Sequence, residues 1–228
     1  MKRIFKIIII GICLGIVLII IRNLFQIDES VFMKGYITAA ILVIIAAVII
    51  NILYFMYYRK KINNAVELFN TGKTQEFISE LNEMLKKAKG KGVKNLINLN
   101  LSAGYIETKD YLSAIEILEA LSEKELKPER IKLVYYINLC NAYFYTSEFD
   151  KQLDLYNSQK SLFDKYKSDN IYGGNIAELN ILLAITEKRY SDAKEMLITA
   201  TNIWHEQKFA DSFKQIGEIL SKAEIQNN

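Results

Sequence analysis

The stretch LSAGYIETKDYLSAIEIL, residues 101–118, decides the fold of this chain. Apolar residues recur every three or four positions on both sides of the polar segment ETKD, residues 107–110. This is the spacing of two amphipathic helices separated by a turn. Helices joined by so short a connection pack antiparallel to one another. The stretch therefore predicts a helical hairpin whose turn lies near Lys109 and Asp110.

The same pattern occurs twice more along the chain. LCNAYFYTSEFDKQLDLY covers residues 139–156, and EKRYSDAKEML covers residues 187–197. The aromatic residue after the turn is Tyr111, Phe149 or Tyr190, at separations of 38 and 41 residues. One hairpin cannot bury its apolar face alone, so in-phase copies predict a stack of hairpins. A generic helical bundle with chance motifs is the alternative.

The whole segment from residue 62 onward is predicted to be helical. One proline and ten glycines leave little turn chemistry for a many-stranded sheet, which favours an all-α fold. Apolar periodicity, broken by short polar or glycine-containing segments, gives the boundaries. We expect helices over residues 60–70, 75–88, 94–107, 111–123, 129–146, 149–167, 173–187, 191–206 and 209–225.

The repeated pattern resembles the tetratricopeptide repeat, whose first helix carries Leu-Gly-x-x-Tyr and whose second carries alanine and an aromatic residue. The copies are degenerate, because Asn98, Tyr136 and Ala177 stand where the family has its first-helix tryptophan. The resemblance covers about residues 94–205. It implies a right-handed superhelical stack over residues 62–228, with a weaker hairpin at 62–89 and a closing helix at 209–225.

The resemblance also implies a partner-binding groove, lined by the first helices of successive repeats. The family's groove positions correspond to Leu99, Ala103, Ile106, Glu107, Val134, Ile137, Asn141, Phe144, Tyr145, Asn175, Glu178, Leu182 and Ile185. We expect a protein or peptide partner to contact Ile106, Glu107, Ile137, Asn141, Phe144, Tyr145, Asn175 and Glu178. Asn141 stands where family members that clamp a peptide carboxylate have asparagine, but Leu99 replaces the clamp's lysine. The groove therefore favours an apolar or aromatic partner segment.

The first 61 residues have a different composition and predict a membrane anchor. Two apolar segments, residues 4–25 and 35–58, are each long enough to cross a bilayer of about 30 Å as a helix. A cleaved signal peptide is the alternative for the first segment. A second apolar segment follows after only about ten residues, and no small-residue cleavage site precedes it, which favours a retained transmembrane hairpin.

The charge distribution predicts the orientation of this hairpin. Residues 1–61 carry eight basic and two acidic residues, which leaves residues 62–228 at −3 although the whole chain is at +3. The basic residues flank the two spans, so the positive-inside rule places both termini in the cytoplasm of a multi-pass plasma-membrane protein. Because the basic excess belongs to the anchor, nucleic acid is not an expected partner. Heavy use of Ile, Lys and Asn suggests a low-GC bacterium.

Gly11 and Gly15 form a G-x-x-x-G motif in the first span. This spacing allows two helices to approach closely, so the motif serves either packing of the two spans or a homodimer. We prefer packing within the chain.

No catalytic residue, metal site or cofactor is expected. His205 is the only histidine, so no histidine-based catalytic constellation has a second candidate, and Cys140 occupies a small-residue packing position. The preferred function is a membrane-anchored, non-enzymatic adaptor or scaffold. The alternative is an accessory subunit of a transport or secretion complex in which the transmembrane hairpin is the functional part. An enzyme would require a cofactor-free pocket with carboxylates such as Glu107 and Glu178.

Overall fold

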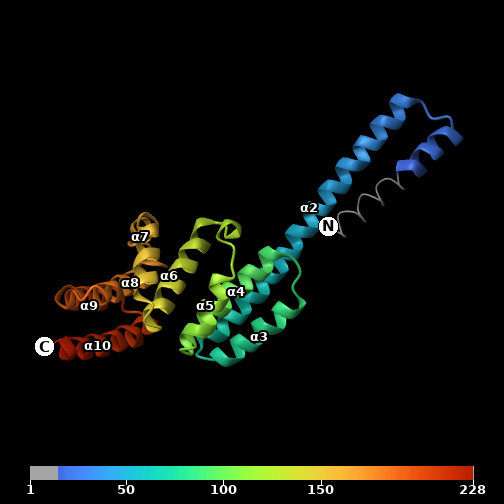
Figure 1. Ribbon diagram of the computed structural model, residues 1–228. Coiled ribbons are helices and arrows are strands. Elements are labelled where there is room, and N and C mark those ends of the chain that lie inside the picture. The colour runs from blue at the N-terminus through green and yellow to red at the C-terminus, as the bar shows by residue number, and fades with distance from the viewer. Residues whose placement is uncertain (1–14, 228) are drawn as a thin grey trace. The chain divides into compact units, whose positions relative to one another are not determined.

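The computed structural model describes residues 15–227 of the chain. Over these residues the protein is all-α and contains no strand, which confirms the all-α part of the predicted fold class. The chain divides into two compact units, Met1–Tyr58 and Arg59–Asn228 (Figure 1). The predicted boundary, after residue 61, lies close to this division.

The first unit contains a helix over Gly15–Leu24 and most of α2 (Glu29–Asn70). Asp28 begins α2 as its N-cap, because its side chain accepts hydrogen bonds from the backbone N–H groups of Ser30 at 2.8 Å and Val31 at 3.4 Å. Arg22 and Glu29 form an ion pair at 3.1 Å across the connection. The predicted loop between the spans is therefore a short, polar turn.

Helix α2 is the one helix among the described residues that is long and apolar enough to cross a membrane. Its most apolar segment is not buried, and large side chains such as Leu42, Val43 and Ile50 are exposed. Asn51, the polar residue within it, donates a hydrogen bond to the carbonyl of Ala47 at 2.9 Å, within its own helix. Residues 4–14 of the predicted first span lie outside the described residues, as does Gly11.

The prediction of separate helices at 35–58 and 60–70 is wrong, because α2 continues without a break from Glu29 to Asn70. The segment RKK, residues 59–61, contains neither glycine nor proline, and lysine and arginine are good helix formers. A change from apolar to basic side chains therefore marks a change of surroundings without ending the helix. Gly72, the first glycine after this segment, lies in the turn that follows α2.

The second unit consists of the last turns of α2 and the helices that follow it. These are α3 (Thr74–Lys87), α4 (Lys91–Glu107), α5 (Tyr111–Glu119), α6 (Glu129–Tyr145), α7 (Phe149–Tyr166), α8 (Gly173–Thr186), α9 (Tyr190–Ile203) and α10 (Gln207–Asn227), with a short 3-10 helix, η1 (Glu123–Glu125), before α6. The boundaries lie within a few residues of the predicted ones. The largest difference is α5, which ends at Glu119 and not at residue 123, because η1 begins a separate turn there.

Four turns in this unit have the same geometry. Gly72, Lys109, Ser147 and Lys188 each have a positive φ between 59° and 77°. In each turn the N–H of the next residue bonds to the carbonyl five positions back, for example Asp110 to Tyr105 at 2.8 Å. This is the Schellman arrangement that ends a helix. The turns at residues 109, 147 and 188 are those of the three sequence copies, and the turn at residue 72 adds a hairpin of the same kind before them.

The hairpins pack against one another in chain order. Helix α4 contacts α3, α5 and α6, and α6 in turn contacts α5, α7 and α8 (Figure 1). We call α4, α6 and α8 the inner helices, because each is the first helix of its hairpin and contacts helices both before and after that hairpin. Their hairpin partners α5, α7 and α9 are the outer helices. One hydrophobic core centres on α6, with Tyr136 and Leu133 fully buried, and a second lies between α8 and α10 around Leu182 and Ile216.

Candidate functional site

The inner helices enclose a cavity of about 650 Å³ with the end of α2 and with α10, which we call the inner cavity. Side chains from six helices and two connections contribute to it. The lining residues are Phe69, Asn70, Ile106, Glu107, Lys109, Tyr111, Asn141, Tyr145, Glu178, Glu206, Asp211, Ser212 and Gln215.

Five of the eight residues that the sequence predicts for the groove line the inner cavity, namely Ile106, Glu107, Asn141, Tyr145 and Glu178. The other three do not. Ile137 is 4% exposed in the core around α6, and Phe144 is 7% exposed in the core between α8 and α10. Asn175 lies half-buried near the start of α8, outside the lining.

A stacked pair of tyrosines forms one wall of the inner cavity. The rings of Tyr111 and Tyr145 are 4.5 Å apart between centroids and inclined by only 9°. Tyr111 is the first residue of α5, and its position is fixed by the N-cap Asp110, whose carboxylate accepts a hydrogen bond from the backbone N–H of Ser113 at 3.2 Å. Burial raises the pKa of both phenols, so both are neutral at physiological pH.

The charged side chains of the inner cavity are mostly acidic. Among the described lining residues, four are carboxylates (Glu107, Glu178, Glu206 and Asp211) and one is a lysine (Lys109). Burial raises the pKa of the Glu178 carboxyl, a hydrogen bond from the Ser212 hydroxyl opposes that shift, and the charge of Glu107 adds to it. Glu178 is thus the partly buried carboxylate of the four, whereas Glu107, Glu206 and Asp211 are exposed.

Asn141 contributes a polar atom without a partner. Its side chain is 8% exposed, it lines the inner cavity, and its Oδ1 has no hydrogen-bond partner among residues 15–227. A buried acceptor without a donor is unfavourable by roughly 1–3 kcal/mol. One residue of the lining therefore carries a buried acceptor that is unsatisfied among the described residues.

Sequence reasoning missed the contribution of α10, which supplies Asp211, Ser212 and Gln215 to the lining. Glycines at the start of α8 allow α10 and the preceding turn to approach. A Cβ at Gly174 would lie 2.3 Å from the Phe209 ring, and a Cβ at Gly173 would lie 2.5 Å from the Trp204 ring. The pair GG at residues 173–174 was the available signal for this close approach.

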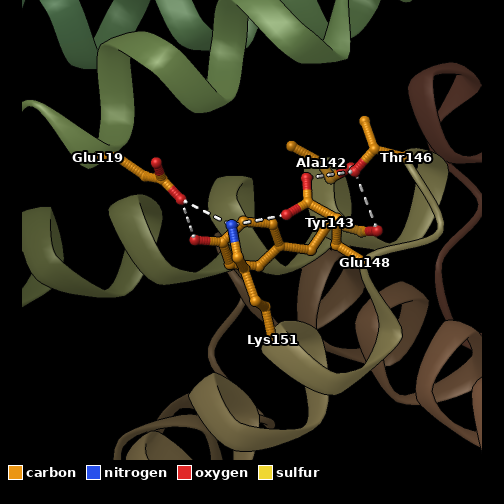
Figure 2. A network of polar contacts seen from close by, with 6 residues as sticks. All are labelled: Glu119, Ala142, Tyr143, Thr146, Glu148 and Lys151. Carbon is orange, nitrogen blue, oxygen red and sulfur yellow. Dashed lines mark hydrogen bonds and ion pairs between the residues drawn. The ribbon is translucent and has the colours of Figure 1, made fainter.

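A polar network on a different part of the unit joins consecutive hairpins (Figure 2). Tyr143 of α6 donates a hydrogen bond to Glu119 at the end of α5, at 2.8 Å, and Lys151 of α7 pairs with Glu119 at 3.4 Å and Glu148 at 2.6 Å. Thr146 donates to Glu148 at 3.1 Å. Each of these groups is engaged by another, so the network holds hairpins together and offers no open site.

A second cavity, of about 750 Å³, lies between the end of α7, α8 and α9. Its lining includes Met196, Ile203 and Trp204 beside Asp192 and Lys167. Asp192 is paired with Arg189 at 2.7 Å, and Lys167 with Asp164 at 3.4 Å. Asp192 and Lys167 are thus neutralised by neighbouring side chains, and the third charged residue of this lining, Glu195, is exposed.

The described residues contain no group of three or more His, Cys, Asp or Glu side chains that could hold a metal ion. Cys140 is fully buried and its thiol pKa is raised by burial, which disfavours the thiolate. No protein-family model matches this chain, and no curated protein and no solved structure is significantly similar to it.

Proposed function

We propose that this chain is a non-enzymatic adaptor, held in the plasma membrane by two N-terminal helices, that binds a protein or peptide partner in the inner cavity. The observation that carries the proposal is the cavity itself. A recess of about 650 Å³ lined by three successive inner helices has the size of a recognition site for one or two side chains. In four hairpins the same kind of turn joins the first helix to the second, which favours a tetratricopeptide-like stack as the scaffold.

The membrane part of the proposal rests on α2 and on the charges around it. The most apolar segment of α2 is not buried among the described residues, so lipid is the natural solvent of its side chains. The basic segment at residues 59–61 favours a cytoplasmic second unit by the positive-inside rule. A tethered adaptor needs only modest intrinsic affinity, because confinement to a surface raises the effective concentration of its partner.

Blocking the inner cavity tests the proposal. Asp211 lies exposed on α10 at its edge, so Asp211→Trp fills the cavity without disturbing the core. Glu195→Trp is the matched control, since Glu195 is an equally exposed acid that lines the second cavity. Tagged full-length chains are captured in mild detergent from their own cells. We expect Asp211→Trp to lose partners that the wild type and Glu195→Trp retain.

Equal recovery of the same partners with both variants would contradict the proposal. An exchange of residues 1–58 for an unrelated two-helix membrane anchor then separates the adaptor from an accessory membrane subunit. Retained partner capture supports the adaptor, because the second unit alone determines binding. Loss of capture, with the second unit still folded, favours the membrane hairpin as the functional part.

A further inference from the structure

The inner cavity has the chemical features of a site for a positively charged group. Its described lining carries four carboxylates and one lysine, and two of these carboxylates, Glu107 and Glu178, come from the first and third inner helices, α4 and α8. Mutual repulsion between them contributes to the raised pKa of Glu178. A cation placed between two carboxylates relieves that repulsion and forms charge-assisted hydrogen bonds.

Asn141 supplies an independent indication of the same ligand. Its Oδ1 is an acceptor, it is buried, and it has no donor among the described residues. A carboxylate ligand would present only acceptors and would leave this atom unpaired. An ammonium presents three donors and a guanidinium five, so either can reach an amide oxygen and the carboxylates together.

The tyrosine pair would also attract a positively charged group. Tyr111 and Tyr145 are stacked at 4.5 Å, and both rings line the cavity. The face of a neutral tyrosine ring attracts a cation within about 6 Å of its centroid. The rings also offer apolar surface to the methylene groups of a long basic side chain.

We propose that the inner cavity binds the ammonium or guanidinium group of a lysine or arginine side chain of the partner polypeptide. Glu107 and Glu178 pair with the charge, Asn141 accepts a hydrogen bond from it, and the Tyr111–Tyr145 wall contacts the aliphatic part of the side chain. The inference rests on the proposed adaptor function and specifies the chemistry of its partner. The second cavity does not compete, since its Asp192 and Lys167 already pair within the chain.

Short peptides test the site directly on the detergent-solubilised full chain. The probes are acetyl-Gly-Lys-Gly-amide and acetyl-Gly-Arg-Gly-amide, with norleucine or acetyl-lysine in place of the basic residue as uncharged controls. Calorimetric titration measures their affinities. We expect millimolar binding of the two basic probes, about tenfold tighter than the uncharged ones, which corresponds to one or two charge-assisted hydrogen bonds.

Two sets of variants locate the binding. Glu107→Gln with Glu178→Gln removes both charges and retains the shape of the cavity, so we expect the tenfold preference to disappear. Glu116→Gln is the matched control, because Glu116 is an exposed acid on α5 outside the cavity, and it should bind as the wild type does. Thermal unfolding of each variant verifies that it is folded.

Equal affinity for basic and uncharged probes, binding unaffected by the double variant, or no binding of the basic probes would each overturn the inference. Partner capture distinguishes this failure from that of the adaptor function. If Asp211→Trp loses the partner while the double glutamine variant retains it, the adaptor function is supported and the cation site is contradicted. If neither variant changes partner capture, both the adaptor function and the cation site are contradicted.

Discussion

The two helices of a hairpin differ greatly in how much they bury. Ten residues of the inner helix α6 are buried, against two, Gln152 and Phe163, of the outer helix α7. Nine residues of the inner helix α8 are buried, against two, Ala193 and Ala200, of α9. An inner helix contacts helices both before and after its own hairpin, whereas an outer helix contacts its hairpin partner and the helix that follows the hairpin. Stability and recognition therefore depend mainly on the inner helices.

The largest predicted effect compares one leucine from each layer. Leu139 of α6 is 3% exposed in the core, whereas Leu112 of α5 is 72% exposed. Leu139→Ala removes buried methyl groups and leaves a cavity, so we expect a loss of about 2–5 kcal/mol in the free energy of unfolding. Leu112→Ala should change it by less than about 0.5 kcal/mol. Urea unfolding of the detergent-solubilised full chain, followed by circular dichroism, measures both.

Similar losses for the two leucine variants would show that the outer layer is as important as the inner one. The comparison is informative because the amino-acid change is the same in both variants. Both leucines also lie outside the inner cavity, so ligand binding does not enter the measurement.

A second, smaller effect concerns the place where α10 packs on the inner layer. Gly174→Ala puts a methyl group 2.3 Å from the Phe209 ring, which must move. We expect a loss of about 1–3 kcal/mol, typical of overpacking, with the greatest loss of amide hydrogen-exchange protection in α10. Hydrogen exchange with mass spectrometry locates the change.

Gly92→Ala is the control for this prediction. Gly92 lies near the start of α4, and a Cβ there meets no described atom within 4 Å. Alanine is a better helix former than glycine, so this variant should be as stable as the wild type or more stable by up to about 1 kcal/mol. Loss of protection in α10 for both variants would show that the approach at Gly174 is not what holds α10.

The layers also explain which features could be predicted from the sequence. Helices and turns are local, so periodicity and the residues around Asp110 placed them within a few positions. Whether a side chain lies in the cavity or in the core depends on contacts between residues far apart in the sequence, which local patterns do not reveal. Five predicted groove residues line the inner cavity because the repeat pattern identifies the inner helices. Phe144, one residue before Tyr145, turns instead into the core that Phe209 and Phe213 of α10 complete.

The contribution of α10 to the inner cavity could not be predicted from the sequence for the same reason. Asp211, Ser212 and Gln215 of α10 follow Glu107 by about a hundred residues, and no periodicity connects them. The continuity of α2 is not predicted, because the composition change at residues 59–61 is typical of a boundary between segments. Charged residues indicate where a helix leaves an apolar environment for water, whereas glycine and proline indicate where a helix ends.

The pH dependence of stability probes the one face of α8 that meets the cavity. Burial raises the pKa of Glu178, so the folded state keeps its proton to a higher pH than the unfolded state does. Its contribution to stability is full below the unfolded pKa and is lost as the pH rises through the folded pKa. Glu178→Gln has no such loss. We expect the melting temperature of this variant, relative to wild type, to increase between pH 4 and pH 7.

The groups that face Glu178 decide how this titration is interpreted. Glu107 from α4, Tyr111 from α5, Tyr145 from α6 and Ser212 from α10 interact with Glu178, and Lys109, Glu206 and Asp211 share the cavity lining with it. Glu107→Gln should lower the pKa of Glu178 toward its ordinary value, because the charge of Glu107 contributes to the raised pKa. The loss of stability between pH 4 and pH 7 should therefore be smaller in this variant than in wild type. A difference in melting temperature between Glu178→Gln and wild type that is constant with pH would mean that Glu178 titrates normally.

The smallest effect is expected for the polar network between hairpins (Figure 2). Lys151 pairs with Glu119 and Glu148, but its side chain is 54% exposed, so water and salt screen both contacts. Lys151→Met should reduce the free energy of unfolding only slightly, and less still in high salt. Tyr143→Phe removes a buried donor from the same carboxylate, so its cost should be larger and independent of salt. A salt-independent loss for Lys151→Met that equals the loss for Tyr143→Phe would place the network inside the core and weaken the distinction between inner and outer helices.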